Sequence, residues 1–161
     1  MPNFVVTVYW TNPGRDTARA MSEENVELVR EWMEAWQRGD RVQVEKSIDS
    51  FDPEIEWDAS GFAERVPDLA RVYHGTEGVR DFWRLWLSSW RDLQFEIKAL
   101  RDAGEEVVLL IENQRQWGRH SGIETQVAPY GFVFTFRDGK VVRVQLYPTP
   151  EEALEAAGLS E

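Results

Sequence analysis

The sequence contains no cysteine and only two histidines, His74 and His120. Without cysteine there is no disulfide, no thiolate nucleophile and no zinc–thiolate site. Neither histidine belongs to a motif with metal-ligand spacing, so the sequence favours a protein without a metal or other cofactor. His74 is expected in a loop or capping role before a helix, and His120 is expected in water at a hairpin tip.

Basic residues and long hydrophobic runs are also scarce. Lys and Arg total 18 against 29 Asp and Glu, which gives a formal net charge of -11. That field repels phosphate backbones and anionic lipids, which argues against nucleic-acid and membrane partners. Residues 4–10 are apolar, but the run is too short to span a bilayer and no basic residue precedes it. It is therefore typical of neither a signal peptide nor an anchor, and we expect a cytoplasmic protein.

The chain has the size of one domain. Its 161 residues, 42% of them hydrophobic, suffice to bury a core. Residues 1–20 stand apart, either as an edge strand or as a tail before Met21, where Met-Ser-Glu-Glu resembles a natural start. The structure-breaking residues 12–16 slightly favour the tail. Residues 21–161 are then expected to form a single domain.

Helical patterns follow Met21. Ser22 is a good N-cap for a first helix, which Gly39 ends. Asp40 and Thr76 are expected to cap a second and a third helix, and Thr149 begins a capping box for a short last one. Two stripes recur at helical spacing: Val26, Val29, Trp32, Met33 and Trp36 in the first helix, and Val79, Phe82, Trp83, Trp86 and Trp90 in the third.

Strand patterns lie between and after these helices. Residues 55–59 alternate between apolar and polar side chains, and residues 95–100 form another candidate strand. The runs 105–117, 123–137 and 140–147, joined by turns at 118–122 and 138–139, predict a long antiparallel meander. Because the helices are rich in Trp, we expect a curved sheet around a helix-lined cavity for a small molecule.

The first hairpin of the meander is expected to have Arg119 and His120 at its tip. Trp117 then pairs with Gly122, and Arg115 pairs with Glu124, so that opposite charges meet across the strands.

For the second hairpin we favour a three-residue loop with Gly139 in the left-handed region, because it places Phe134 opposite Val142. A two-residue loop would place Phe134 opposite Arg143. The face expected toward the cavity then carries Leu109, Ile111, Asn113, Arg115, Glu124, Gln126, Tyr130, Phe132, Phe134, Val142, Val144 and Leu146.

Polar residues on this face suggest a cavity mouth. Asn113 and Gln126, with the pair Arg115 and Glu124, could orient a polar group of a ligand. Alternatively they are rim residues in water, and the Arg–Glu pair is a cross-strand salt bridge of little energetic value. The aromatic residues that would bind a flat, polycyclic ligand, unless they are simply core, are Trp32, Trp36, Trp57, Trp86, Tyr130 and Phe132.

Several local strings together resemble the SnoaL-like branch of the nuclear transport factor 2-like superfamily. The resemblance implies an α+β cone, with three N-terminal helices packed on a strongly curved antiparallel sheet, and a homodimer formed through the outer sheet face. Relatives include polyketide cyclases, ketosteroid isomerases, epoxide hydrolases and non-catalytic proteins, so the fold does not select an activity. The strings are Ser-Glu-Glu-Asn-Val-Glu-Leu-Val at 22–29, Trp-Gln-Arg-Gly-Asp at 36–40, Glu-Ile-Glu-Trp at 54–57, Tyr-His-Gly-Thr-Glu-Gly-Val at 73–79, Phe-Arg-Asp-Gly-Lys-Val at 136–141 and Ala-Leu-Glu-Ala-Ala-Gly-Leu at 153–159.

The resemblance singles out Asp58 as a candidate catalytic base, because it falls where the base of ketosteroid isomerases would lie. The positions of the two oxyanion donors hold Trp32 and Phe132, so a steroid isomerase of that kind is not expected. Asp58 among aromatic rings could still act as a general base. Alternatively, Asp58 lies on the polar side of an edge strand, or it pairs with Arg65 or Arg71 from the following loop.

Three function classes therefore stay open. The chain could be a cofactor-free isomerase, cyclase or hydrolase that uses Asp58, or a protein that sequesters a hydrophobic metabolite without reaction. For a hydrolase, the resemblance suggests an arginine with two acids that activate water, as in the epoxide hydrolase relatives, and the candidates are Arg115, Asp58 and Glu124. The third class is a partner-binding domain that uses the outer sheet face, expected to carry Val108, Leu110, Val127 and Val133 beside Gln114 and Gln116.

Overall fold

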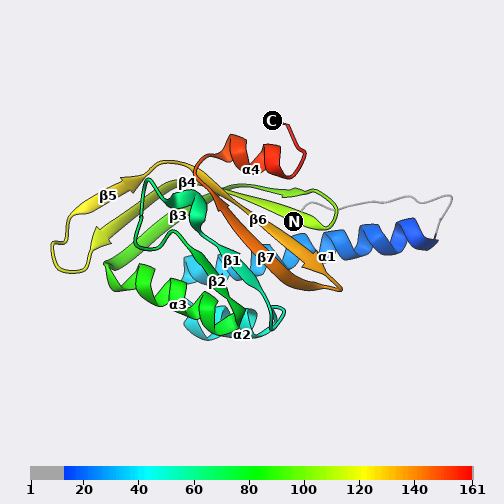
Figure 1. The fold of residues 1–161 in the computed structure, drawn as a ribbon, viewed down its shortest axis with the longest axis horizontal. Helices are drawn as coiled ribbons and strands as arrows, with labels where there is room; N and C mark the ends of the chain where they lie inside the picture. The colour runs from blue at the N-terminus through cyan, green and yellow to red at the C-terminus, as the bar shows by residue number, and fades with distance from the viewer. Residues whose placement is uncertain (1–12, 161) are drawn as a thin grey trace.

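The fold is an α+β cone in which one curled sheet separates two layers of helices (Figure 1). The structure is a computed structural model that describes the backbone of residues 13–160 and the side chains of residues 21–160. The apolar run at 4–10 lies outside the described residues, so the nature of that segment and the expected domain start at Met21 stay predictions. No helix in the described range is long and apolar enough to cross a membrane.

Two helices precede the first strand, and the third follows the second strand. Ser22 does not cap the first helix, which begins at Pro13; its hydroxyl instead donates to the carboxylate of Asp102 in the sheet. The helices are α1 (Pro13–Arg38), α2 (Arg41–Asp49), the 3-10 turn η1 (Ser60–Phe62), α3 (Gly75–Ser88) and α4 (Pro150–Ala156).

The sheet is mixed rather than purely antiparallel, because β1 runs parallel to β7. Its order is β2-β1-β7-β6-β4-β3, with β5 paired to β4 beyond β6. The strands are β1 (Glu56–Asp58), β2 (Val72–His74), β3 (Trp90–Asp102), β4 (Glu106–Gly118), β5 (Glu124–Val127), β6 (Tyr130–Arg137) and β7 (Lys140–Tyr147).

Two of the predicted helix caps are present. The Asp40 side chain accepts a hydrogen bond from the Gln43 backbone N–H at 3.1 Å, and the Thr149 hydroxyl accepts one from the Glu152 N–H at 3.2 Å. The predicted cap at Thr76 is wrong, because α3 begins at Gly75 with its backbone in the left-handed region (φ 74°). Trp90 does not continue the α3 stripe either; it begins β3.

The main core fills the space between α1–α3 and the concave face of the sheet. A second, smaller core lies on the outer face, where Ala153 and Leu154 of α4 cover Val108, Leu110 and Val133. Figure 1 shows α4 on the side of the sheet opposite α2 and α3. The apolar outer area expected to be available to a partner is therefore largely covered by the chain's own last helix.

The predicted register of the first hairpin is wrong. The turn is wider than expected, because the Gly118 N–H donates to the Ile123 carbonyl at 3.0 Å. Trp117 consequently pairs with Glu124, and Arg115 with Gln126. The register is shifted by two residues, an even number, so the shift by itself leaves every side chain on its predicted face.

The three-residue loop predicted for the second hairpin is also wrong. Asp138 (φ 53°) and Gly139 (φ 76°) form a two-residue turn, and Arg137 pairs directly with Lys140. A bulge then leaves Val142 unpaired, so Phe134 lies opposite Val144 and not opposite Arg143. The bulge keeps the apolar face intact, but Val141 replaces Val142 in the core.

Candidate ligand-binding cavity

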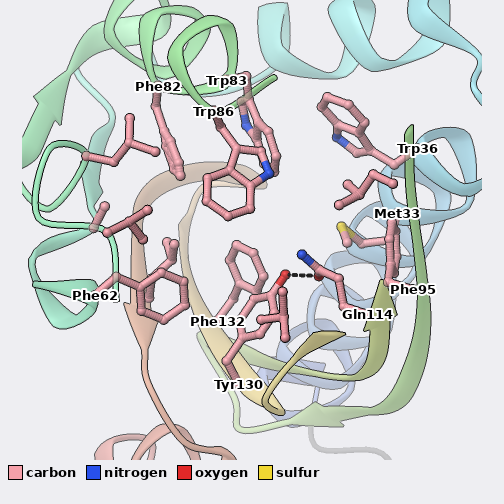
Figure 2. A pocket seen from close by; sticks show the side chains of 16 residues that line it. Met33, Trp36, Phe62, Phe82, Trp83, Trp86, Phe95, Gln114, Tyr130 and Phe132 are labelled. Atoms are coloured by element: carbon pink, nitrogen blue, oxygen red, sulfur yellow. Dashed lines mark hydrogen bonds between the residues drawn. The ribbon is translucent and has the colours of Figure 1, made fainter. Parts of the chain in front are cut away.

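An apolar cavity lies where α1 and α3 face the curved end of the sheet (Figure 2). The cavity volume is about 40 Å³, which leaves room for water but is too small for an aromatic ring. α1 contributes Met33 and Trp36 to the walls. The other lining residues come from the segment after β1, from α3 and from five strands: Ala59, Phe62, Val66, Leu69, Phe82, Trp83, Trp86, Leu93, Phe95, Gln114, Val127, Tyr130, Phe132 and Leu146.

The cavity wall carries few polar groups. Among the described lining residues there is no Asp, Glu, His, Lys or Arg. Hydrogen-bonding capacity is limited to Gln114, Tyr130 and the indole N–H groups of Trp36, Trp83 and Trp86. An apolar wall with a few placed polar groups is the usual composition of a small-molecule site.

Tyr130 and Gln114 form a buried hydrogen-bonded pair. The Tyr130 hydroxyl donates to Gln114 Oε1 at 2.5 Å, as the dashed line in Figure 2 marks, and Gln114 Nε2 donates to Gln116 Oε1 at 3.2 Å. Burial raises the pKa of Tyr130 above its ordinary value, because the charged phenolate would lose its hydration there. The hydroxyl is therefore neutral at physiological pH and acts as a donor.

An irregularity at Asn113 brings Gln114 to the cavity. Asn113 has a positive φ of 51°, and β4 carries an extra residue there relative to β3. Inward-facing residues along β4 are therefore Ile111 and then Gln114, a step of three instead of two. In β5 and β6, which pair with β4, the inward-facing residues Val127 and Tyr130 are also three positions apart. The two sides of the ladder therefore bend together.

The same bend removes three predicted ligand-binding residues from the cavity. Asn113, Arg115 and Gln126 are exposed on the outer face and do not line the cavity. Asn113 donates to Glu96 at 2.7 Å, and Arg115 contacts Gln94 at 3.3 Å. The alternative interpretation as rim residues in water is the one that fits these positions.

The predicted outer positions of Gln114, Gln116 and Val127 are wrong for the same reason. Gln114 and Val127 line the cavity, and Gln116 is buried beside Gln114. A sequence signal for this reversal exists in Pro129, which lacks an N–H and interrupts the strand opposite Asn113.

Asp58, the predicted base, faces away from the cavity. Its neighbour Trp57 is in the core and pairs with Val144, whereas Asp58 pairs with Gln145 on the opposite face. Asp58 Oδ1 accepts from the Ser60 N–H at 2.9 Å and from its hydroxyl at 2.5 Å, which holds the turn into η1.

The charged partner of Asp58 is Arg143 at 3.6 Å, and neither Arg65 nor Arg71 pairs with it. The predicted arrangement of Arg115 with two acids is not formed. Arg115 and Glu124 lie 3.5 Å apart on the outer face, while β7 and β6 separate β1 from β4. The geometry thus supports a structural role for Asp58 in holding the segment that supplies Ala59 and Phe62 to the wall.

The predicted aromatic residues divide between the wall and the core behind it. Trp36, Trp86, Tyr130 and Phe132 line the cavity. Trp32 and Trp57 are fully buried behind them and meet edge to face with ring centroids 6.0 Å apart. The contribution of Phe62, Phe82 and Trp83 was not predicted as ligand contact, although Phe82 and Trp83 belong to the predicted α3 stripe.

Four indole N–H groups are buried without a hydrogen-bond partner in the described part of the chain: Trp32, Trp36, Trp57 and Trp83. A buried donor left unpaired typically costs about 1–3 kcal/mol, so native proteins contain few of them. Two of the four, Trp36 and Trp83, lie on the cavity wall with their ring centroids 4.6 Å apart.

The described residues offer no metal centre, because no three of their His, Cys, Asp and Glu side chains gather to hold an ion. His74 ends β2 just before α3 and gives no side-chain cap, and His120 is exposed in the hairpin turn.

Comparisons with known proteins agree with this architecture. The model of the SnoaL-like domain family matches residues 29–144. No curated protein matches the chain. Similar solved structures include an NTF2-like protein of unknown function from Burkholderia pseudomallei, which is 22% identical (82% of this chain and 95% of that chain covered, TM-score 0.64).

Two further structures are each 18% identical. One is a candidate SnoaL-like polyketide cyclase from Jannaschia sp. (78% and 85% covered, TM-score 0.61), and the other is TerC co-crystallised with polyporic acid (76% and 89% covered, TM-score 0.62). At these identities the likeness shows the fold.

Proposed function

The chain belongs to the SnoaL-like domain family, and from that premise we propose that it binds a hydrophobic, aromatic small molecule in the cavity beneath Trp36 and Trp83. The composition of the wall carries this proposal. It combines stacked and tilted rings with a buried Tyr130–Gln114 pair, a suitable surface for a flat ring system with one or two polar groups.

Binding requires the cavity to widen. Its 40 Å³ is well below the roughly 150 Å³ that holds a benzene molecule in an apolar protein cavity. Among the aromatic side chains of the wall, those able to move are the half-buried Trp36, Trp83, Trp86 and Phe95, whereas Phe132 is fixed in the core. We therefore propose that the ligand enters by displacing tryptophan side chains of α1 and α3.

Sequestration is favoured over acid–base catalysis by the chemistry of the described wall. It contains no carboxylate or imidazole, and Asp58 points elsewhere, so a general base is missing from the site. Two of the similar structures, the candidate polyketide cyclase and the complex with polyporic acid, are consistent with a family that handles small organic molecules.

A cofactor-free cyclase, isomerase or hydrolase is the second candidate function, and Tyr130 is the observation that favours it. Its raised pKa keeps a proton on the hydroxyl, which could donate to a carbonyl oxygen of a bound molecule in place of Gln114. In that case the hydroxyl would stabilise developing negative charge on the oxygen rather than remove a proton.

The homodimer implied by the family also remains a proposal. Because α4 fills the apolar outer area, a second copy would have to pack on the polar part of the face formed by Glu96, Asn113, Arg115 and Glu124. Light scattering distinguishes a dimer from a monomer directly.

Intrinsic fluorescence and thermal melting test the binding proposal. We expect polycyclic aromatic compounds to quench tryptophan emission and to raise Tm. At a ligand concentration of 100 Kd the stabilisation is about 2.7 kcal/mol, or roughly 5–11 °C for a domain of this size.

A pair of variants locates the site. Val127→Phe fills the cavity and should weaken binding at least about tenfold, the effect of losing about 1.4 kcal/mol. Ile123→Phe places the same ring just before β5 at a position that is 66% exposed, and should leave affinity unchanged. If no compound of a broad aromatic panel quenches or stabilises the protein, the cavity is only a loosely packed part of the core and the proposal fails.

A further inference from the structure

Trp36 and Trp83 separate the apolar cavity from the surface on its other side. Trp36 lines both the cavity and a surface groove of about 140 Å³, and Leu93 is shared between the same two spaces. Trp83 lines the cavity and the adjoining hollow between α2 and α3. We call these two indoles the tryptophan partition. A molecule that displaced the partition would occupy the cavity and reach the groove at once.

The groove is basic although the chain is acidic. Three arginines, Arg41, Arg91 and Arg119, line it against one carboxylate, that of Asp92, in a chain of net charge -11. We call it the arginine groove. Asp92 accepts a hydrogen bond from the Leu93 backbone N–H at 2.8 Å, so its carboxylate is held by the start of β3.

None of these three arginines forms an ion pair with a described residue. The Arg41 guanidinium lies over the Trp36 ring at 5.9 Å from its centroid. Arg119 donates to the carbonyls of Leu87 and Ser88 at the end of α3 and of Trp90 at the start of β3, at 3.1–3.2 Å. These contacts position the cations without neutralising them.

The contrast with the neighbouring arginines is sharp. On α3, Arg84 lies 2.6 Å from Asp81, and Arg80 contacts Glu45, Asp49 and Glu77. Acids therefore neutralise the cations along α3 and leave those of the arginine groove available to an anion.

The partition itself lacks an acceptor. The indole N–H groups of Trp36 and Trp83 are buried without a partner, and the Arg41 guanidinium, which also lacks an anion, lies over the Trp36 ring. A carboxylate would complement both kinds of donor, since it accepts several hydrogen bonds and those from charged donors are the stronger ones.

From this juxtaposition we propose that the ligand is an aromatic carboxylate, with its ring in the apolar cavity and its carboxylate in the arginine groove beside Trp36. This inference rests on the proposed binding function and adds the charge and orientation of the bound molecule. The acidic surface elsewhere would disfavour random binding of such an anion, so affinity would come from this groove.

Two probes of the same shape, one charged and one neutral, test whether the site prefers a carboxylate. Calorimetric titration with 2-naphthoate and with neutral 2-naphthamide should give at least about tenfold tighter binding of the carboxylate, equivalent to about 1.4 kcal/mol. Raising the ionic strength should reduce the difference in affinity between the two probes, because the groove is open to solvent.

Three variants assign the effect to the groove. Arg41→Gln and Arg91→Gln should each weaken 2-naphthoate binding by about threefold to tenfold and leave 2-naphthamide binding unchanged. Arg30→Gln, a matched substitution of an exposed arginine paired with Glu27 on α1, should change neither.

The outcomes separate the two proposals. If naphthamide binds as tightly as naphthoate, or if both groove variants bind naphthoate like the wild type, the carboxylate inference is wrong while the binding function stands. If neither probe nor any other aromatic compound binds, the binding function fails and the inference fails with it.

Discussion

Gly131 in β6 offers a sharp test of how α4 sits on the sheet. A Cβ atom built on this glycine would lie 2.6 Å from the Ala153 Cβ and 3.0 Å from Leu110 Cδ2. Carbon atoms in favourable contact are about 3.5–4.0 Å apart. The substitution Gly131→Ala therefore forces α4 away from the strand, because the closest atom, the Ala153 Cβ, is fixed to the α4 backbone and cannot swing aside.

The expected cost follows from two opposing effects. Overpacking of a well-packed core costs about 1–3 kcal/mol. Replacing glycine in a strand regains roughly 0.5–1 kcal/mol of backbone entropy. The net destabilisation of Gly131→Ala is then between about 0 and 2.5 kcal/mol, which lowers Tm by up to roughly 10 °C in a domain of this size.

Urea unfolding of a double-mutant cycle measures the clash itself. Ala153→Gly removes the closest atom and alone costs about 1 kcal/mol through its helix propensity. In the double variant the missing Cβ makes room for the new one. We expect a favourable coupling between the two sites of about 0.5–3 kcal/mol, as for residues in direct contact.

Strict additivity would refute this reasoning. If the losses in free energy of unfolding of the two single variants, each relative to the wild type, sum to the loss of the double variant within about 0.5 kcal/mol, Ala153 does not lie over Gly131. The covering of Val108, Leu110 and Val133 by α4 would then be in doubt, and the outer face would again be available to a partner.

Two other predictions concern the candidate site. Burial raises the pKa of Tyr130 in the folded protein, so above the ordinary tyrosine pKa of about 10 the unfolded chain loses this proton before the folded protein does. The free energy of unfolding should therefore fall with rising pH by up to about 1.4 kcal/mol per pH unit. Urea unfolding from pH 8 to 11 should show a shallower fall for Tyr130→Phe than for the wild type. Asp58→Asn keeps an acceptor for Ser60 and loses only the half-exposed pairing with Arg143, so it should cost no more than about 1 kcal/mol and leave ligand affinity and any turnover unchanged. A loss of turnover of a hundredfold or more in that variant, the usual effect of removing a general base, would restore Asp58 as the base.

Periodicity in the sequence was sufficient to find the main helices and the antiparallel meander, but it did not reveal that β1 runs parallel to β7. The stripes that contain Trp32 and Trp83 were correctly assigned to helices, and the meander was found because apolar residues recur on one face of three runs. These signals are strong because burial of one face constrains every second or every third to fourth residue.

The site was harder to predict because it depends on breaks in that periodicity. Strict alternation from Ile111 places Asn113 and Arg115 inside, and one residue with positive φ replaces them with Gln114 and Gln116. Asparagine is among the few non-glycine residues that tolerate this conformation, but it does so in only a minority of cases. Asn113 by itself therefore does not reveal which face the polar residues adopt, and the available signal is Pro129, which interrupts the paired strand.

Asp58 was misplaced for a different reason. The family resemblance suggested a catalytic base just after Trp57, but the strand there is only three residues long. Neighbouring side chains on so short a strand point to opposite faces, so an offset of one position decides between the cavity and the outer face. The polar partners Ser60 and Arg143 decide it here.

The bend shared by β4 and its partner strand has a consequence for how this part of the chain can change in length. The spacing from Ile111 to Gln114 matches that from Tyr130 back to Val127, so the hydrogen-bonded ladder stays in step across the bend. Deleting one residue near Asn113 alone, or near Pro129 alone, would put the two halves of the ladder out of step. Insertions and deletions at this rim should therefore be tolerated only as compensating pairs, one in each strand.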